Sequence, residues 1–442
     1  MLPTLFTANG GLADFANILA RGGKWRASER SATTRLTIGE PNNVADFTKR
    51  YDGFDLRPML TSTAPIAIRS ASCARSSINV IWQSGAHMLY SVQLLRAVAA
   101  VLVVVCHAIH KQGQMSGTGA TWEFGGSGVD LFFIISGFIM CYVTMDREIG
   151  ARDFLKARVL RIVPLYWTLS LVALAVYLVN PAVVNSSGGT TTVINSFTLI
   201  PTGDKFLIQT GWTLSYEFLF YLVFAASFIF PMRTRLPFTC AVLIFFVAGG
   251  MILTPSDPTL RFLTSPLLLE FVMGIAAYLY IRDDSRPLLL SLALVVGGLL
   301  ALVVMPANDA ANGRVITYGL PFMMIFAGMV SMEWLVRAAC ESIPGRIATA
   351  IGAASYSLYL AHPFALAAAA LIVKRYGIQH HPFASIAILV SSALVAGYAC
   401  FSIVEVNLNR WIKSTLHKRA ARLSGAVHEA AERRKTTQTW QP

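Results

Sequence analysis

Apolar runs of membrane-span length recur along this chain from residue 91 to residue 404. Lipid cannot hydrogen-bond to the backbone, whereas a helix satisfies its own backbone groups and can cross a bilayer. Hydrophobic residues make up 55% of the 442 residues and charged residues only 13%, against about 25% charged in a soluble domain. The sequence therefore predicts an all-α polytopic membrane protein.

Ten apolar segments predict a bundle of about ten transmembrane helices. Short polar turns separate most of them, and the connection 181–211 is the long exception, of a length that is often functional within a bundle. The segments lie at about 91–110, 128–146, 162–180, 212–230, 238–253, 266–282, 287–305, 315–333, 353–373 and 383–404.

Arginine and lysine residues orient the predicted bundle. One set of alternate loops carries more of them than the other set, and the positive-inside rule assigns the richer set to the cytoplasm. Both termini of the chain are then predicted to be cytoplasmic. A net charge of +13 fits this orientation, so it gives little reason to expect nucleic-acid binding.

The two ends of the chain differ from the apolar middle. Residues 1–87 are rich in Arg, Ser, Thr and Gly, which predicts a disordered extension. Met88 directly precedes the first apolar run, so an over-extended start codon is the alternative. Residues 88–405 form the predicted membrane domain, and residues 406–442 a basic cytoplasmic tail that could touch anionic lipid. The six cysteines are scattered and show no metal-binding or disulfide pattern.

Arg96 and His107 lie eleven residues apart in the first apolar run. Eleven residues at about 100° each bring both side chains to within about 20° of one helix face, about 16 Å apart along the axis. Ionisable groups are costly in a bilayer and mark functional sites. Imidazole transfers protons near neutral pH, and guanidinium binds phosphate. The alternative for His107 is an interhelical hydrogen bond.

Three further charged residues lie near the predicted membrane surfaces. Asp130, at the outer end of the second run, is expected to orient the His107 imidazole, and an N-terminal helix cap is the alternative. Arg158 and Arg161 share a face at the cytoplasmic start of the third span. With Arg96 they would form a phosphate-binding mouth, whereas each alone is also explained as a positive-inside anchor.

Polar side chains also occur deeper in the later runs. Glu217 lies about one turn into the hydrocarbon region, and such a group needs a partner or water. Glu270 is a second acid in an apolar run, and structural ion pairing is the alternative for both acids. His362 is a second imidazole in the predicted membrane interior.

The joint order of these motifs resembles the membrane acyltransferase-3 family, in particular its exopolysaccharide O-acetyltransferase members. The resemblance spans about residues 88–405, and although each motif is weak alone, their order is specific. The motifs are Leu95-Arg96-Ala97 with His107, Gly126 to Phe133 with Ser136 to Phe138, Arg158 to Trp167, Trp212 to Tyr221 with Glu217, and Tyr356 to His362.

The resemblance implies a multi-pass enzyme of the bacterial inner membrane. It would transfer an acetyl group from acetyl-CoA to a hydroxyl of a cell-surface or exopolysaccharide sugar or of its lipid-linked precursor. It gives His107 the catalytic role and Arg96 an essential partner role.

The other predicted site residues follow from their positions in these motifs. Asp130 and Glu217 are expected to assist catalysis, and no metal is expected. The coenzyme phosphates are expected to contact Arg96, Arg158 and Arg161, and the substrate to contact Ser136, Trp212, Tyr216 and His362.

A transporter of a sugar or lipid-linked precursor is the alternative function. It would equally explain polar residues inside a bundle, but it predicts inverted repeats with broken helices at matching positions. The sequence shows no convincing internal repeat.

Overall fold

The computed structural model describes residues 89–145, 147–184, 190–282, 286–305, 311–418 and 421–422. All of them fall in the compact unit Pro65–Pro442. The predicted extension 1–87, with its possible start at Met88, and the end of the predicted tail lie outside the described residues. Within these ranges the long elements are all helices, and an isolated bridge joins Thr191 to Lys205. The predicted all-α class is confirmed.

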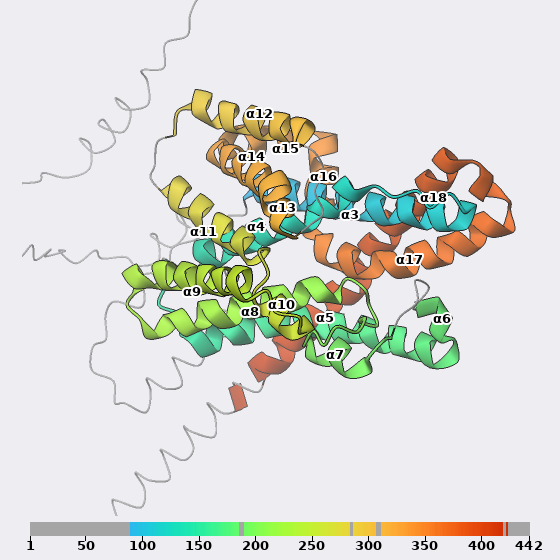
Figure 1. Ribbon diagram of the computed structural model, residues 1–442, viewed down its shortest axis with the longest axis horizontal. Coiled ribbons are helices and arrows are strands. Elements are labelled where there is room, and N and C mark those ends of the chain that lie inside the picture. Colours follow the sequence, from blue (N-terminus) through green and yellow to red (C-terminus); the bar gives the residue numbers. More distant parts are fainter. Residues whose placement is uncertain are drawn as a thin grey trace, which may run out of the picture. The chain divides into compact units, whose positions relative to one another are not determined.

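The helices follow one another with short connections (Figure 1). They are α3 (Tyr90–Ser116), η2 (Glu123–Ser127), α4 (Gly128–Thr144), α5 (Ala151–Val179), α6 (Pro181–Val184), α7 (Val193–Thr198), α8 (Gly211–Ala226), η3 (Ser227–Ile229), α9 (Met232–Leu253), α10 (Pro258–Leu263), α11 (Leu268–Arg282), α12 (Leu288–Val304), α13 (Ala311–Arg314), η4 (Val315–Gly319), α14 (Leu320–Ser331), α15 (Glu333–Cys340), α16 (Ile343–Ala353), α17 (Ser355–Arg375), η5 (Ile378–His380), α18 (Pro382–Ala399) and η6 (Cys400–Glu405).

Eight helices of the described chain are long and apolar enough to cross a membrane. A ninth span results if η4, α14 and α15 count as one element bent by 80°, and α12 is a shorter apolar helix. Each of the ten predicted segments is therefore helical. The multi-pass architecture is established, while the count of ten and the cytoplasmic termini stay predictions.

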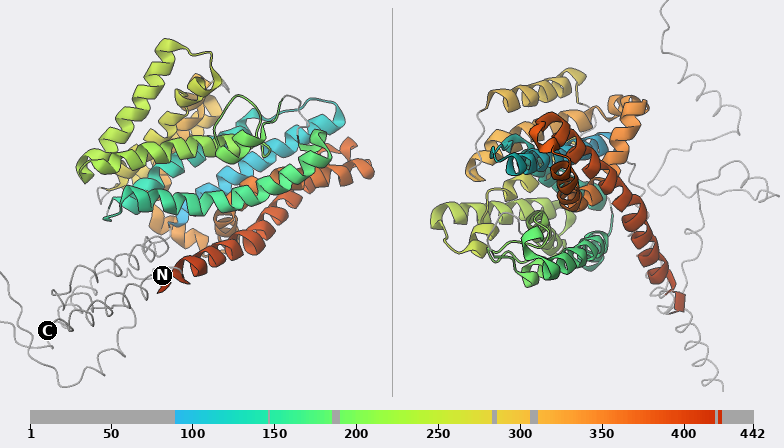
Figure 2. Two further views of the ribbon diagram at one scale, coloured as in Figure 1. Left: turned by 90° about the horizontal axis from the view of Figure 1, so that it is seen from below. Right: turned by 90° about the vertical axis from the view of Figure 1, so that its right-hand side faces the viewer.

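The last helical segment runs further than the sequence predicted. From α18 through η6 it continues to Lys418, a length of 37 residues. The first part of the predicted basic tail is thus a helical extension of the last span, which projects from the bundle in Figure 2.

Helix α3 is held at its beginning by Glu333. The Glu333 carboxylate accepts hydrogen bonds from the Tyr90 amide at 2.6 Å, the Ser91 amide at 3.0 Å and the Ser91 hydroxyl. The first amides of a helix have no intrahelical partner, and the helix dipole favours an anion there. The bend between α14 and α15 brings this carboxylate to the helix that carries Arg96 and His107.

Helix α3 packs against α4, α16, α17 and α18, and α4 packs on its other side against α11. In Figure 1, α12 and α14 lie above α4, while α5, α8 and α9 lie below it. The α4–α11 contact depends on glycine, because a Cβ atom on Gly274 would lie 2.8 Å from the Phe138 nitrogen and 2.9 Å from the Gly137 Cα. Small residues let membrane helices approach this closely.

We expect Gly274→Ala to lower the free energy of unfolding by about 1–3 kcal/mol, because the added methyl group meets backbone atoms that cannot rotate away. Gly249→Ala in α9 is the matched control, since a Cβ atom there meets nothing within 4 Å. Unfolding in detergent measures both variants. Equal stability of the two would show that the glycine contact does not hold α4 against α11.

Candidate active site

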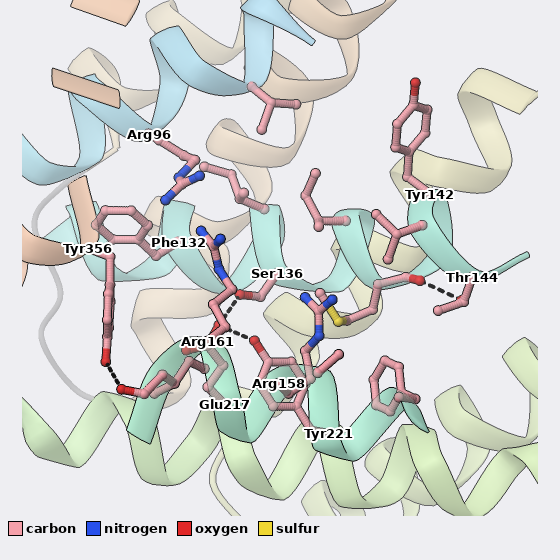
Figure 3. A pocket seen from close by; sticks show the side chains of 18 of the residues that line it. Arg96, Phe132, Ser136, Tyr142, Thr144, Arg158, Arg161, Glu217, Tyr221 and Tyr356 are labelled. Atoms are coloured by element: carbon pink, nitrogen blue, oxygen red, sulfur yellow. Dashed lines mark hydrogen bonds between the residues drawn. The ribbon is translucent and has the colours of Figure 1, made fainter. Parts of the chain in front are cut away.

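A cavity of about 650 Å³ is lined by residues of α3, α4, α5, α8 and α17 (Figure 3). Its size is that of a small-molecule or coenzyme site. Residues at the start of α3, in the loop after α4 and near the end of the last helix also line it, among them Leu89, Arg147 and Lys413. The positive-inside rule predicts that this end of the bundle faces the cytoplasm.

Arg96, Arg158 and Arg161, the three residues predicted to contact coenzyme phosphates, all line this cavity. In Figure 3 the guanidinium of Arg96 points from α3 toward those of the two α5 arginines. The Arg96 Nε donates to the Ser355 hydroxyl at 3.1 Å. The Arg158 Nε and the Gln93 Oε1 are buried and have no hydrogen-bond partner. Buried polar atoms are rarely left without partners. The Arg158 donor fits an anionic group of a ligand, whereas the Gln93 oxygen is an acceptor and fits a donor group.

Glu217 lies in the same cavity and is held by two hydroxyl groups. Ser136 donates to its Oε1 at 2.7 Å, and Tyr221 donates to the same atom at 2.5 Å. Thr213, Glu217 and Tyr221 all line the cavity, and their spacing of four residues puts them on one face of α8. That spacing was the sequence signal for Thr213 and Tyr221, which the motif-based prediction missed.

Trp212 and Tyr216, predicted to contact substrate, are not among the residues that line this cavity. The Trp212 side chain is 37% exposed. The Tyr216 ring packs against Phe262 and Phe133, with centroids 4.4 and 5.7 Å away. A helix turns by about 100° per residue, so neighbours of the cavity-lining residues point elsewhere.

His107 and His362 form a pair between α3 and α17. The His107 Nδ1 lies 2.8 Å from the His362 Nε2, and the His362 Nδ1 lies 3.1 Å from the Leu358 carbonyl oxygen. His362 is completely buried, whereas His107 is exposed. The interhelical hydrogen bond that was the alternative for His107 is present.

Aromatic side chains separate the cavity from the histidine pair. Tyr359 and Phe132 line the cavity, and their ring centroids lie 5.8 Å apart. The Tyr359 ring lies 6.0 Å from that of His362, and its hydroxyl lies 3.0 Å from the Thr213 hydroxyl. One layer of side chains thus stands between the arginine cavity and the pair.

Asp130 is not placed beside His107, and the predicted contact between the two is wrong. Its carboxylate forms an ion pair with Arg314, which also donates to the Gly126 carbonyl at 3.1 Å. Asp130 is fully buried in the first turn of α4, and the N-cap position belongs to Ser127. A buried carboxylate requires a counter-charge, and the end of the short helix α13 supplies Arg314, which the sequence showed only as a loop residue.

Glu270 is a second buried acid near this ion pair. It lies completely inside the protein, close enough to Asp130 and Arg314 to interact with their charges. Both of its carboxylate oxygens are buried without a hydrogen-bond partner, so the ion pairing considered for it is not observed among the described residues.

We expect Arg314→Gln to destabilise the protein by about 3–5 kcal/mol, because it leaves the buried Asp130 carboxylate without its counter-charge. Adding Asp130→Asn should restore part of the lost stability, because it removes the buried negative charge that has no counter-charge. Thermal unfolding of the single and double variants in detergent measures both effects. A double variant less stable than Arg314→Gln would contradict this assignment.

No group of three or more His, Cys, Asp or Glu side chains that could hold a metal ion occurs among the described residues.

The comparisons with known proteins identify the family. A family model described as an acyltransferase domain, of the acyltransferase-3 type, matches residues 89–404. The chain belongs to this acyltransferase-3 family. This membrane acyltransferase is also 31% identical over 307 residues to the exopolysaccharide production protein ExoZ of Rhizobium meliloti (strain 1021). That alignment covers 66% of this chain and 92% of the relative, and no solved structure matches.

Proposed function

We propose that this acyltransferase transfers an acetyl group from acetyl-CoA to a hydroxyl of an exopolysaccharide sugar or of its lipid-linked precursor, in the bacterial inner membrane. The observation that carries the proposal is the position of two sites along α3. Arg96 lines the arginine cavity, and His107, eleven residues further along the helix, is paired with His362. The name of the similar ExoZ protein favours an exopolysaccharide acceptor.

The cavity residues fit the phosphates of a coenzyme. Arg96, Arg158 and Arg161 gather positive charge on one wall, and the Arg158 Nε has no partner within the protein. Guanidinium groups bind phosphate through paired, charge-assisted hydrogen bonds. Glu217 lies at this end rather than beside His107, so we assign it to arranging the arginine wall.

Bound acetyl-CoA would supply an activated acyl group and a thiolate leaving group. The rise between Arg96 and His107 is about 16 Å, which an extended pantetheine arm can follow along α3. The aromatic layer of Tyr359 and Phe132 lies on this path, and its side chains must rotate for the arm to pass.

His107 acts as the general base in this proposal. It accepts the proton of the acceptor hydroxyl while the new C–O bond forms and the thioester C–S bond breaks, and it then returns the proton to the thiolate. General base catalysis of this kind contributes about 10²–10⁴-fold. Transient acylation of His107 is a less favoured alternative. Asp130 has no part in the chemistry, because Arg314 holds its carboxylate.

Membranes that contain the full chain test the proposal against the transporter alternative. We expect radiolabelled acetyl-CoA to release free CoA and to label polysaccharide taken from a strain lacking this gene. Movement of a precursor across the membrane without CoA release would support a transporter instead. NMR of polysaccharide from the deletion strain and its parent would identify the sugar and its modified position.

A further inference from the structure

The hydrogen bond between His107 and His362 lies in the plane of both rings. The ring planes are inclined by 13°, the centroids are 5.0 Å apart, and the two facing nitrogens are 2.8 Å apart. Rings stacked face to face would keep their atoms about 3.5 Å apart. The imidazoles therefore meet edge to edge, with one N–H pointing directly at the lone pair of the other ring.

The partners of His362 decide which nitrogen carries the hydrogen. A carbonyl oxygen can only accept, so the His362 nitrogen facing the Leu358 carbonyl, Nδ1, is the donor. In a neutral imidazole the other nitrogen, Nε2, then has no hydrogen and accepts. The N–H of the pair must consequently belong to His107, at Nδ1.

His362 lies inside α17, where its side chain reaches the Leu358 carbonyl four residues earlier. Pro363 follows it and has no N–H, so the Tyr359 carbonyl lacks its usual helical donor. Complete burial of His362 excludes water that would compete for its two hydrogen bonds.

We infer that His362 is a positioning residue that fixes His107 as the Nδ1–H tautomer, so that the lone pair on the His107 Nε2 faces the acceptor hydroxyl. The inference rests on the proposed acyl transfer. With Nδ1 occupied by His362, the Nε2 is the nitrogen of the exposed His107 ring that is left to accept a proton. His362 itself is not placed to contact the sugar, because both of its ring nitrogens are engaged by the protein.

Histidine-labelled full-length protein in lipid bilayers tests the tautomer by ¹⁵N NMR, without any substrate. We expect the His107 Nδ1 to be protonated, the Nε2 to be unprotonated, and a coupling through the hydrogen bond to link Nδ1 to the His362 Nε2. The signals are assigned among the eight histidines by their disappearance in His107→Asn. A His107 ring protonated at Nε2 in the resting protein would overturn the inference.

Two amide variants of similar polarity test the effect on the rate. The His362→Gln amide reaches the place of Nε2 and can accept from His107, whereas the shorter His362→Asn amide reaches only the place of Nδ1. We expect kcat to fall by about 10–100-fold in His362→Asn and much less in His362→Gln, with an unchanged KM for acetyl-CoA. A general loss of folding would lower acetyl-CoA binding in both variants.

The outcomes separate this inference from the proposed function. Active wild-type protein with equal kcat in the two amide variants would overturn the positioning role of His362 alone. Wild-type protein that releases no CoA in the presence of acceptor would instead count against acyl transfer, whatever the tautomer of His107.

Discussion

His107→Ala is expected to stop acyl transfer and to leave the binding of acetyl-CoA unchanged. The His107 ring does not line the arginine cavity, so its removal leaves the proposed phosphate-binding wall in place. The rate should fall by about 10²–10⁴-fold, the contribution of a general base. Transfer of radiolabel from acetyl-CoA to polysaccharide in membranes measures the rate of acyl transfer. Equilibrium binding measures the affinity for acetyl-CoA separately.

His110→Ala is the matched control for this variant. His110 is an exposed histidine of the same helix, one turn further along, and its ring contacts the Gln114 side chain. We expect wild-type labelling of the polysaccharide in this control. Wild-type labelling in His107→Ala would remove His107 from the chemistry and leave the interhelical hydrogen bond as its role.

Arg158→Ala is expected to raise the KM for acetyl-CoA by about 10–100-fold, because hydrogen bonds to a charged group contribute about 1.5–3 kcal/mol and each 1.4 kcal/mol is tenfold in affinity. The value of kcat should change little, since Arg158 binds the phosphates equally before and during the reaction. Arg158→Lys keeps the charge but loses the paired donors of the guanidinium, so its KM should lie between those of Arg158→Ala and wild type. Steady-state CoA release measures both constants.

Two comparisons make the Arg158 result specific to phosphate. Arg152→Ala removes one charge from an exposed position of the same helix that does not line the cavity, and it should leave KM unchanged. S-acetylpantetheine has no phosphate groups, so wild type and Arg158→Ala should use it equally poorly. A KM for S-acetylpantetheine that still depends on Arg158 would refute the phosphate role.

The physics of the membrane made much of the fold predictable. A helix is the way for an apolar run to satisfy its own backbone in lipid, so each of the ten runs could be assigned as a helix. The number of membrane spans was harder to predict from the sequence, because it depends on where helices end and bend. The bent pair of helices around Glu333 shows this. Glu333 lies directly after the bend, and its carboxylate accepts hydrogen bonds from the Tyr90 and Ser91 amides.

The candidate site was predictable where its residues share one helix. The spacing of Arg96 and His107 and that of Arg158 and Arg161 follow from helix geometry alone, and these residues take the predicted helical positions. Predictions that required the facing helix were less successful. Trp212, Tyr216 and Glu217 were predicted from one motif, but the rotation of α8 turns only Glu217 of the three into the cavity.

The sequence by itself determined the family, the helices and the basic residues available to one end of the bundle. Only the tertiary structure decided the partner of each charged or titratable group: Arg314 for Asp130, and His362 for His107. The physical reason is that a sequence sets the positions of side chains around their own helix, whereas the partner across an interface depends on which helices pack together and at what height. The packing of α17 against α3 brings two imidazoles to hydrogen-bonding distance over a sequence separation of 255 residues.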